Sequence, residues 1–109
     1  MKILLVEDDK EISEMLIDFL QMEGFEVHGT FDGAQAVKRF FSESYDLVIL
    51  DLMLPKISGL EVMKRIRKES VVPIIILSAK DTDSDKIFGL GLGADDYITK
   101  PFSLTEVLA

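Results

Sequence analysis

Short strand-like segments alternate with longer segments of helical periodicity along the chain. The strand-like segments cover residues 2–6, 25–29, 46–50, 74–77 and 96–100. Between them, apolar residues recur three or four positions apart, which is the spacing of an amphipathic helix. One such stripe, formed by Ile12, Met15, Leu16 and Phe19, is expected to lie mostly in the core. The pattern predicts a strand followed by a helix, repeated five times, with the last helix cut short at Ala109.

Strands that alternate with helices predict an α/β fold with a parallel sheet covered on both faces. Residues 46–50 are apolar on both faces of the predicted strand, as a central strand requires. Right-handed connections restrict the arrangement to a doubly wound sheet. Residues 1–109 contain no repeat, linker or low-complexity segment and are expected to form a single domain.

Three predicted helices open with a capping box, in which two residues three positions apart can bond the backbone at the helix start. The pairs are Asp32–Gln35, Ser58–Glu61 and Ser103–Glu106.

Polar residues follow the predicted strands where each strand ends. They are Glu7, Asp8 and Asp9 after the first strand, Asp51 after the third, Ser78 and Lys80 after the fourth, with the small Ala79 between them, and Lys100 with Pro101 after the fifth. The carboxyl ends of parallel strands meet at one edge of a doubly wound sheet, and ligands bind there. We therefore expect these side chains to form one site.

The chemistry of this set favours a magnesium site with a phosphorylatable carboxylate. Clustered carboxylates repel one another unless a cation joins them, and oxygen ligands suit Mg²⁺. A carboxylate beside Mg²⁺, such as Asp51, can attack phosphorus to give an aspartyl phosphate. Lys100 and Ser78 can then hold phosphoryl oxygens. Alternatively, Asp51 alone could be a helix cap or an ion-pair partner of Lys100.

Composition narrows the function further. The formal net charge of −8 argues against direct binding of nucleic acid by this chain. No apolar run reaches the roughly 20 residues that span a bilayer, and no signal segment opens the chain. We therefore expect a cytoplasmic protein without a membrane partner. The absence of cysteine excludes a disulfide framework and a cysteine nucleophile.

Four blocks of sequence resemble the receiver domain of bacterial two-component response regulators. They are ILLVEDD, LVILDLMLPKISG, PIIILSAK and GADDYITKPF. The resemblance covers essentially the whole chain and is greatest to regulators with a winged-helix DNA-binding output domain. It implies a flavodoxin-like fold of five strand–helix units with strand order 2-1-3-4-5. It also implies a C-terminal output domain that is absent from these 109 residues.

The resemblance assigns a role to each residue of the acidic site. Asp51 matches the phospho-acceptor, and Glu7 and Asp8 match the acidic pair that holds Mg²⁺. The backbone carbonyl of Met53 is expected to complete the metal site. Asp9 lies outside the pair and is interpreted as a helix-start residue.

Further roles follow from the same resemblance. Ser78 matches the switch hydroxyl and Tyr97 the aromatic switch residue. Lys100 matches the phosphate-binding lysine, and Lys100–Pro101 is a candidate cis peptide. Met53, Ala79 and Lys80 occupy the positions that control access to the phosphoryl group and its lifetime.

The implied function is a signalling switch rather than a turnover enzyme. A sensor histidine kinase, docking beside the first helix, would phosphorylate Asp51. The surface of helix 4 (predicted at 82–93), strand 5 (96–100) and helix 5 (103–109) would then change and pair two receivers in a homodimer. DNA would be bound by the absent output domain alone. His28, the single histidine, is interpreted as a surface residue.

Three other functions compete with this interpretation. A phosphatase of the haloacid-dehalogenase type needs a second carboxylate where this chain has Met53. A nucleotide or flavin domain needs a glycine-rich turn after the first strand, where this chain has three acids. A phosphorylation-independent receiver that acts as a protein-binding module remains the main alternative.

Overall fold

The fold is described from a computed structural model of the chain. It describes residues 1–52, 54, 57–78 and 96–99, with the backbone alone for residues 78 and 96–99. The elements are β1 (Lys2–Val6), α1 (Lys10–Met22), β2 (Glu26–Thr30), α2 (Gly33–Ser42), β3 (Leu47–Asp51), α3 (Gly59–Arg67), β4 (Ile74–Ser78) and β5 (Asp96–Thr99). The predicted helices at 82–93 and 103–109 lie outside the described residues.

The strands form one parallel sheet in the order β2-β1-β3-β4-β5, which confirms the predicted fold class and strand order. Strand β1 has the predicted bounds, and the boundaries of the other four strands differ from the predictions by one residue. In particular, β3 includes Asp51 as its last residue instead of ending before it. The backbone that carries this carboxylate is therefore fixed by strand pairing, because Asp51 lies in register with Leu77 of β4.

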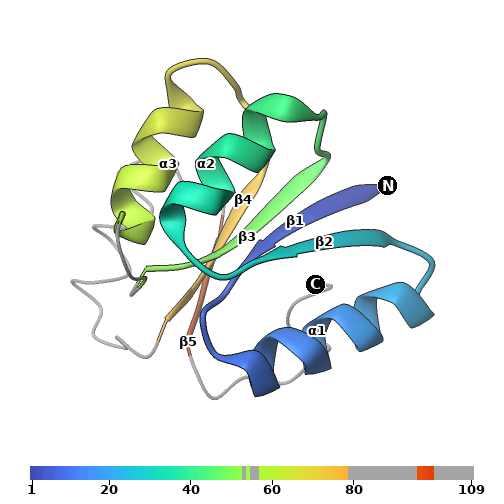
Figure 1. Cartoon of the computed structure of the whole chain (residues 1–109). Coiled ribbons are helices and arrows are strands. Elements are labelled where there is room, and N and C mark those ends of the chain that lie inside the picture. Colours follow the sequence, from blue (N-terminus) through green and yellow to red (C-terminus); the bar gives the residue numbers. More distant parts are fainter. Residues whose placement is uncertain (53, 55–56, 79–95, 100–109) are drawn as a thin grey trace.

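Helices cover both faces of the sheet (Figure 1). On one face, α2 and α3 lie side by side, and their buried Ala36, Phe40, Val62 and Ile66 pack on alternate strand residues. On the other face, α1 buries Leu16 and Leu20 against the remaining strand residues. Val48, Ile49 and Leu50 of β3 are fully buried. The predicted central strand is confirmed, because helices pack on both of its faces.

Helix α1 has specific signals at both ends. Asp9 is its N-cap and accepts hydrogen bonds from the amides of Glu11 and Ile12 at 3.0 and 3.2 Å, as interpreted from the sequence. At the other end Gly24 has a φ angle of 93°, a left-handed conformation that glycine adopts without steric cost. The amides of Gly24 and Phe25 bond back into the last turn and complete a Schellman motif.

The apolar stripe on α1 lies as predicted. Leu16 is fully buried, Ile12 and Phe19 are half-buried, and Met15 is 43% exposed. None of the helices in the described part of the chain is long and apolar enough to cross a membrane.

Two of the three predicted capping boxes fall on described residues. Asp32 caps α2 by accepting from the amide of Gln35 at 2.8 Å. The side chain of Gln35 reaches back to the amide of Phe31, one residue before the cap, instead of to the cap itself. Ser58 caps α3 by accepting from the amide of Glu61 at 3.3 Å. The pair Ser103–Glu106 lies outside the described residues.

Gly33, the first residue of α2, explains how closely this helix approaches the segment before α3. A Cβ atom on Gly33 would lie 2.8 Å from the Cβ atom of Ile57 and closer still to its carbonyl oxygen. Any larger residue would separate α2 from this segment. The glycine thus fixes the packing of the loop that follows Asp51.

Candidate functional site

The acidic site follows from the register of the two central strands. Val6 of β1 lies opposite Leu50 of β3, so the next residues, Glu7 and Asp51, emerge side by side at the carboxyl edge of the sheet. This is also where the strand order changes direction, since β2 lies on one side of β1 and β3 on the other. A doubly wound sheet places its ligand site at such a point.

The structure brings Glu7, Asp8 and Asp51 together. One carboxylate oxygen from each residue lies within 4.8 Å of the others. Glu7 is fully buried, Asp51 is 5% exposed, and Asp8 is exposed. Glu7 and Asp51 therefore form the buried floor of the group, and Asp8 lies on the side that faces solvent.

Hydrogen bonds from neighbouring elements fix the position of Glu7. Its amide donates to the carbonyl of Thr30 at the end of β2, at 3.1 Å. Its carboxylate Oε2 accepts from the amide of Asp9 at 3.2 Å. The Thr30 hydroxyl donates to the carbonyl of Leu5 at 3.1 Å and ties the ends of β1 and β2 together. The buried acid is thus oriented by backbone groups.

The segment after Asp51 turns back sharply toward the strand. The amide of Gly59 donates to the carbonyl of Leu52 at 3.0 Å. A Cβ atom on Gly59 would overlap the Asp51 carbonyl oxygen and lie 2.6 Å from the Cα atom of Leu52. The N-cap of α3 is Ser58, and those of α1 and α2 are Asp9 and Asp32. The alternative interpretation of Asp51 as the cap of a described helix is therefore wrong.

The three carboxylates fit a small hard cation. Oxygen ligands about 2.1 Å from Mg²⁺ stand about 3.0 Å apart when adjacent and about 4.2 Å apart when opposite in an octahedron. The 4.8 Å limit on the separations in this group allows such an arrangement after small side-chain movements. The donor set consists of oxygen alone, which suits Mg²⁺ better than a soft metal. The acidic pocket is consistent with a divalent metal site.

Other predicted site residues are described in part or not at all. Ser78 ends β4 at the same edge as Asp51, and its backbone lies in register with Thr99. The backbone of Tyr97 lies in register with Ile76. The side chains of Ser78 and Tyr97 are not among those described. Outside the described residues lie Met53, Ala79, Lys80, Lys100 and Pro101.

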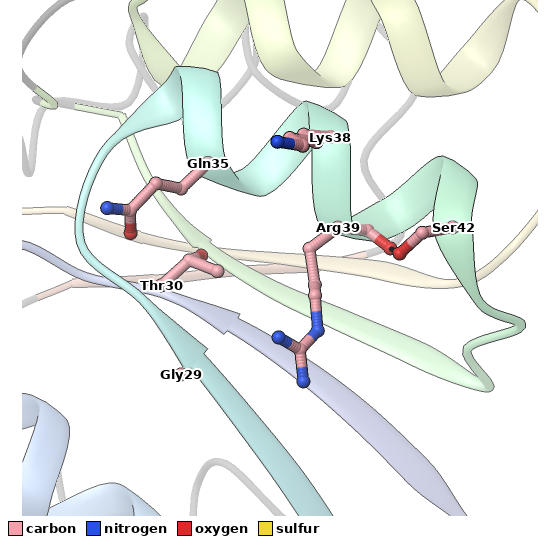
Figure 2. A pocket seen from close by; sticks show the side chains of 6 residues that line it. All are labelled: Gly29, Thr30, Gln35, Lys38, Arg39 and Ser42. Atoms are coloured by element: carbon pink, nitrogen blue, oxygen red, sulfur yellow. Dashed lines mark hydrogen bonds between the residues drawn. The ribbon is translucent and has the colours of Figure 1, made fainter.

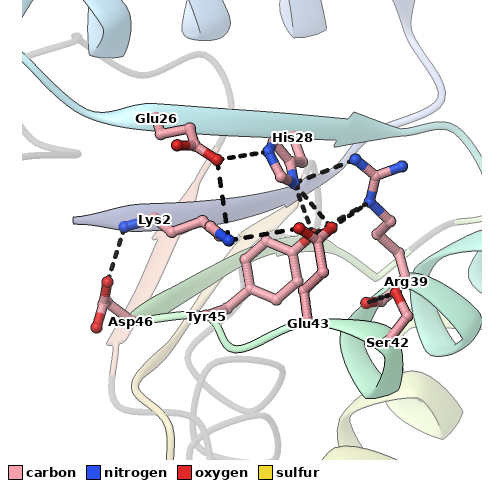
Figure 3. A network of polar contacts seen from close by, with 8 residues as sticks. All are labelled: Lys2, Glu26, His28, Arg39, Ser42, Glu43, Tyr45 and Asp46. Carbon is pink, nitrogen blue, oxygen red and sulfur yellow. Dashed lines mark hydrogen bonds and ion pairs between the residues drawn. The ribbon is translucent and has the colours of Figure 1, made fainter.

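His28, interpreted from the sequence as a surface residue, is partly exposed and more enclosed than that interpretation implied. Its side chain is 18% exposed and lies within a polar network at the opposite, amino end of the sheet (Figure 3). The network comprises Lys2, Glu26, His28, Arg39, Ser42, Glu43, Tyr45 and Asp46. The two ring nitrogens of His28 lie 2.8 Å from the Tyr45 hydroxyl and 2.8 Å from a Glu26 carboxylate oxygen. The histidine therefore joins β2 to the segment before β3.

The surroundings shift two ionisation equilibria in this network. Burial is the largest influence on Tyr45 and raises the pKa of its hydroxyl above 10.0. Burial also opposes ionisation of Glu43, but the hydrogen bond and charge of Lys2, with the charge of His28, outweigh it and lower the pKa of this carboxyl group. The Nζ atom of Lys2 lies 3.4 Å from Oε1 of Glu43. Glu43 is thus held as a carboxylate.

Sequence reasoning missed the supports around the acidic site. The contact of Gly59 with Asp51 and the bond from Glu7 to Thr30 depend on chain segments that only the fold brings together. One signal was available, since glycine directly after the cap Ser58 is a poor helix former. Such a glycine indicates a close backbone approach.

Comparison with known proteins gives a consistent result. The response regulator receiver domain family matches residues 3–109. An uncharacterized transcriptional regulatory protein, YcbL of Bacillus subtilis (strain 168), is 53% identical over 106 residues, which cover 97% of this chain and 47% of YcbL. The regulatory protein VanRc of Enterococcus gallinarum is 49% identical over 108 residues, which cover 99% of this chain and 47% of VanRc. The chain thus spans about half the length of these curated relatives.

Solved structures agree with the sequence comparison. The Francisella response regulator 1452 receiver domain superposes with a TM-score of 0.95 at 38% identity, covering 98% of this chain and 89% of that one. The BeF3-activated N-terminal receiver domain of Klebsiella pneumoniae RstA has a TM-score of 0.94 at 33% identity, covering 99% of this chain and 92% of that one. With the family match, the fold and the acidic site in agreement, the chain belongs to the response regulator receiver domain family.

Proposed function

We propose that this chain is a phosphorylation-activated signalling switch whose phospho-acceptor is Asp51. The observation that carries the proposal is the position of Asp51 at the buried end of β3, with its carboxylate in a group shared with Glu7 and Asp8. Membership of the receiver family supports a role in two-component signalling.

The proposed reaction is transfer of a phosphoryl group from a phosphohistidine of a sensor kinase. A carboxylate oxygen of Asp51 forms the new bond to phosphorus while the bond from phosphorus to the histidine nitrogen breaks, and the nitrogen keeps the electron pair. Glu7, Asp8, Asp51 and the Met53 carbonyl would hold Mg²⁺, which neutralises phosphoryl charge when it is bound. The chain lacks the second carboxylate of a phosphatase, so we propose a switch rather than a turnover enzyme.

The docking site for the kinase is proposed on α1. Met15 lies there and is 43% exposed within an otherwise buried or half-buried stripe.

A phosphoryl group on Asp51 adds about −1.5 to −2 charge and three acceptor oxygens next to the end of β4. Lys100 and Ser78 would bind these oxygens, and movement of Ser78 would let Tyr97 turn inward. The small side chain of Ala79 would leave room for the group, and Met53 and Lys80 would set its lifetime.

The output is proposed to be dimerisation through helix 4, strand 5 and helix 5. The relatives named as transcriptional regulatory proteins are about twice as long, which supports a DNA-binding output domain in a longer protein. The winged-helix type, the cytoplasmic location and the absence of DNA contacts by this domain remain predictions. Sedimentation of the longer protein with beryllofluoride should show a dimer, and an unchanged mass would contradict this part of the proposal.

The decisive experiment is intact mass spectrometry after incubation with acetyl phosphate. We expect one phosphoryl group on the wild type with Mg²⁺, none with a chelator, and none on Asp51→Asn. Asp18→Asn, at an exposed position of α1, is the matched control and should be phosphorylated like the wild type.

A folded wild type that gains no phosphoryl group would overturn the proposal. A beryllofluoride titration then excludes a short-lived adduct, because beryllofluoride binds without being hydrolysed. Failure in both experiments would favour the phosphorylation-independent protein-binding module.

A further inference from the structure

A second pocket lies away from the acidic site, between the end of β2 and α2. Its volume is about 360 Å³, and it is lined by Gly29, Thr30, Gln35, Lys38, Arg39 and Ser42 (Figure 2). The four helix residues are spaced three, four and seven positions from Gln35, so they occupy one face of α2. The pocket volume is near the lower end of the range for small-molecule sites.

The hydrogen-bond donors that this pocket offers to a ligand come from Lys38, Gln35 and Arg39, since the two hydroxyl groups use their donors on the backbone. Lys38 supplies an ammonium group that forms no ion pair with any described residue. Gln35 uses its carbonyl oxygen to accept from the amide of Phe31, which leaves its NH₂ group for a ligand. The hydroxyls of Thr30 and Ser42 donate to backbone carbonyls.

Arg39 is held in place at the edge of the pocket. Its Nε donates to Glu43 at 3.0 Å, and one terminal nitrogen lies 3.2 Å from the Nδ1 atom of His28. The other terminal nitrogen forms no bond with the described residues. An arginine oriented by neighbours loses less side-chain entropy when it binds a ligand.

The charge of the pocket is opposite to that of the chain. The chain carries a net charge of −8, yet two cations and no carboxylate are among the described lining residues. The charge of Arg39 is partly balanced by Glu43, 3.0 Å away, so Lys38 supplies most of the free positive charge toward a phosphate monoester, which carries about −1.5 to −2 at neutral pH. Arginine and lysine are also the usual protein partners of phosphate.

We propose that this pocket binds the phosphate group of a small molecule, independently of phosphorylation at Asp51. The pocket is also connected to the acidic site. Thr30 lines it, and the Thr30 carbonyl accepts from the amide of Glu7. A ligand that fixes Thr30 therefore acts one hydrogen bond away from the acidic group.

The test is a titration followed by NMR in a chelator, with Asp51→Asn as the background so that phosphorylation cannot contribute. Inorganic phosphate and glycerol 3-phosphate are added separately, with sodium chloride at equal ionic strength as the control. We expect saturable shifts of the amides of Gly29, Thr30 and Lys38 with at least one of the two phosphates. Tighter binding of glycerol 3-phosphate would identify an organic phosphate as the ligand class, whereas equal binding would identify phosphate alone.

Two variants make the test specific. Lys38→Met keeps the aliphatic stem but removes the charge and should weaken binding about tenfold or more. Gln35→Glu keeps the oxygen that accepts from Phe31 but places a negative charge at the pocket, and should weaken binding at least as much. Lys64→Met, at an exposed lysine of α3, is the matched control and should bind as the background protein does.

Shifts that do not saturate, or that sodium chloride reproduces, would overturn the proposal. Equal weakening by Lys38→Met and Lys64→Met would do the same, because it would indicate attraction to the overall charge. The two variants alter exposed positions, so loss of the fold is not an expected cause of lost binding.

Discussion

Gly59 lies against Asp51 so closely that a single added carbon atom on Gly59 would overlap the carbonyl oxygen of Asp51. Gly59 is the first residue of α3, and Asp51 is the last residue of β3. The start of the helix therefore sets the position of the backbone that carries the proposed phospho-acceptor.

Replacement of Gly59 with alanine should damage both stability and phosphorylation. The Cβ atom meets backbone atoms of Asp51 and Leu52, which cannot rotate away. We expect the free energy of unfolding to fall by about 1–3 kcal/mol and phosphorylation of Asp51 to slow. Urea denaturation and intact mass spectrometry measure the two effects.

Gly29→Ala is the matched control for this substitution. A Cβ atom at position 29 would lie 3.0 Å from the Cδ1 atom of Ile17, the flexible end of a side chain that can move. Its stability should change by less than about 1 kcal/mol. Equal losses in the two variants would contradict a specific role for the contact between Gly59 and Asp51.

Neutralising Asp8 should change stability in opposite directions with and without metal. Asp8→Asn removes one of three clustered negative charges, so the variant should be more stable than the wild type in a chelator. At a Mg²⁺ concentration of 100 times the dissociation constant, the free energy of unfolding of the wild type should rise by about 2.7 kcal/mol. That of the variant should rise much less. Thermal unfolding across a Mg²⁺ series measures this difference. Asp18→Asn should respond to Mg²⁺ as the wild type does, and a wild type without any response would contradict the metal site.

The hydroxyl of Ser13 should be dispensable for folding. Ser13 is 1% exposed, and its Oγ atom forms no hydrogen bond with the described residues. Ser13→Ala removes a buried polar group and improves helix propensity, so we expect a gain of about 1 kcal/mol in the free energy of unfolding. Ser58→Ala, which removes the cap of α3, should instead lose about 1 kcal/mol. Denaturant unfolding of both variants measures these opposite changes in the free energy of unfolding. A clear decrease for Ser13→Ala would show that its hydroxyl contributes to folding, and would contradict this prediction.

Glu43 should contribute to acid sensitivity. Its pKa lies below the ordinary 4.5, so the unfolded chain binds the proton more readily than the folded one. The stability that Glu43 contributes is therefore complete above about pH 4.5 and is lost as the pH falls through the folded-state pKa. An NMR titration of the carboxyl carbon should give a midpoint below 4.5. Lys2→Met should raise the midpoint, and a wild-type midpoint at or above 4.5 would contradict this account.

The sequence predicted the grouping of Glu7, Asp8 and Asp51 because strand ends are local signals. Glu7 and Asp51 each follow an apolar run directly, with Asp8 next to Glu7, and parallel strands bring their carboxyl ends to one edge of the sheet. The strand order itself came from the family resemblance. The boundaries of all strands except β1 differed by one residue, because the hydrogen bonds of neighbouring strands, and not hydrophobicity, decide where pairing stops.

The polar network and the phosphate pocket could not be predicted in the same way. His28 alternates with buried Val27 along β2, a pattern typical of a solvent-exposed position. Only the packing of α2 and of the segment before β3 places Arg39, Glu43 and Tyr45 around it. Contacts between segments that are distant in the chain leave no periodic signal in the sequence.

The two ends of the sheet carry opposite electrostatic arrangements. At the amino end, cations and anions alternate around His28 and hold the strands in register. At the carboxyl end, three like charges are held together by backbone hydrogen bonds and tight packing. A cation that neutralises one of these charges lowers the repulsion between the others. The free energy of unfolding should therefore rise when a cation binds to the three carboxylates. We therefore expect the stability of the described part of the chain to depend on what binds at this edge.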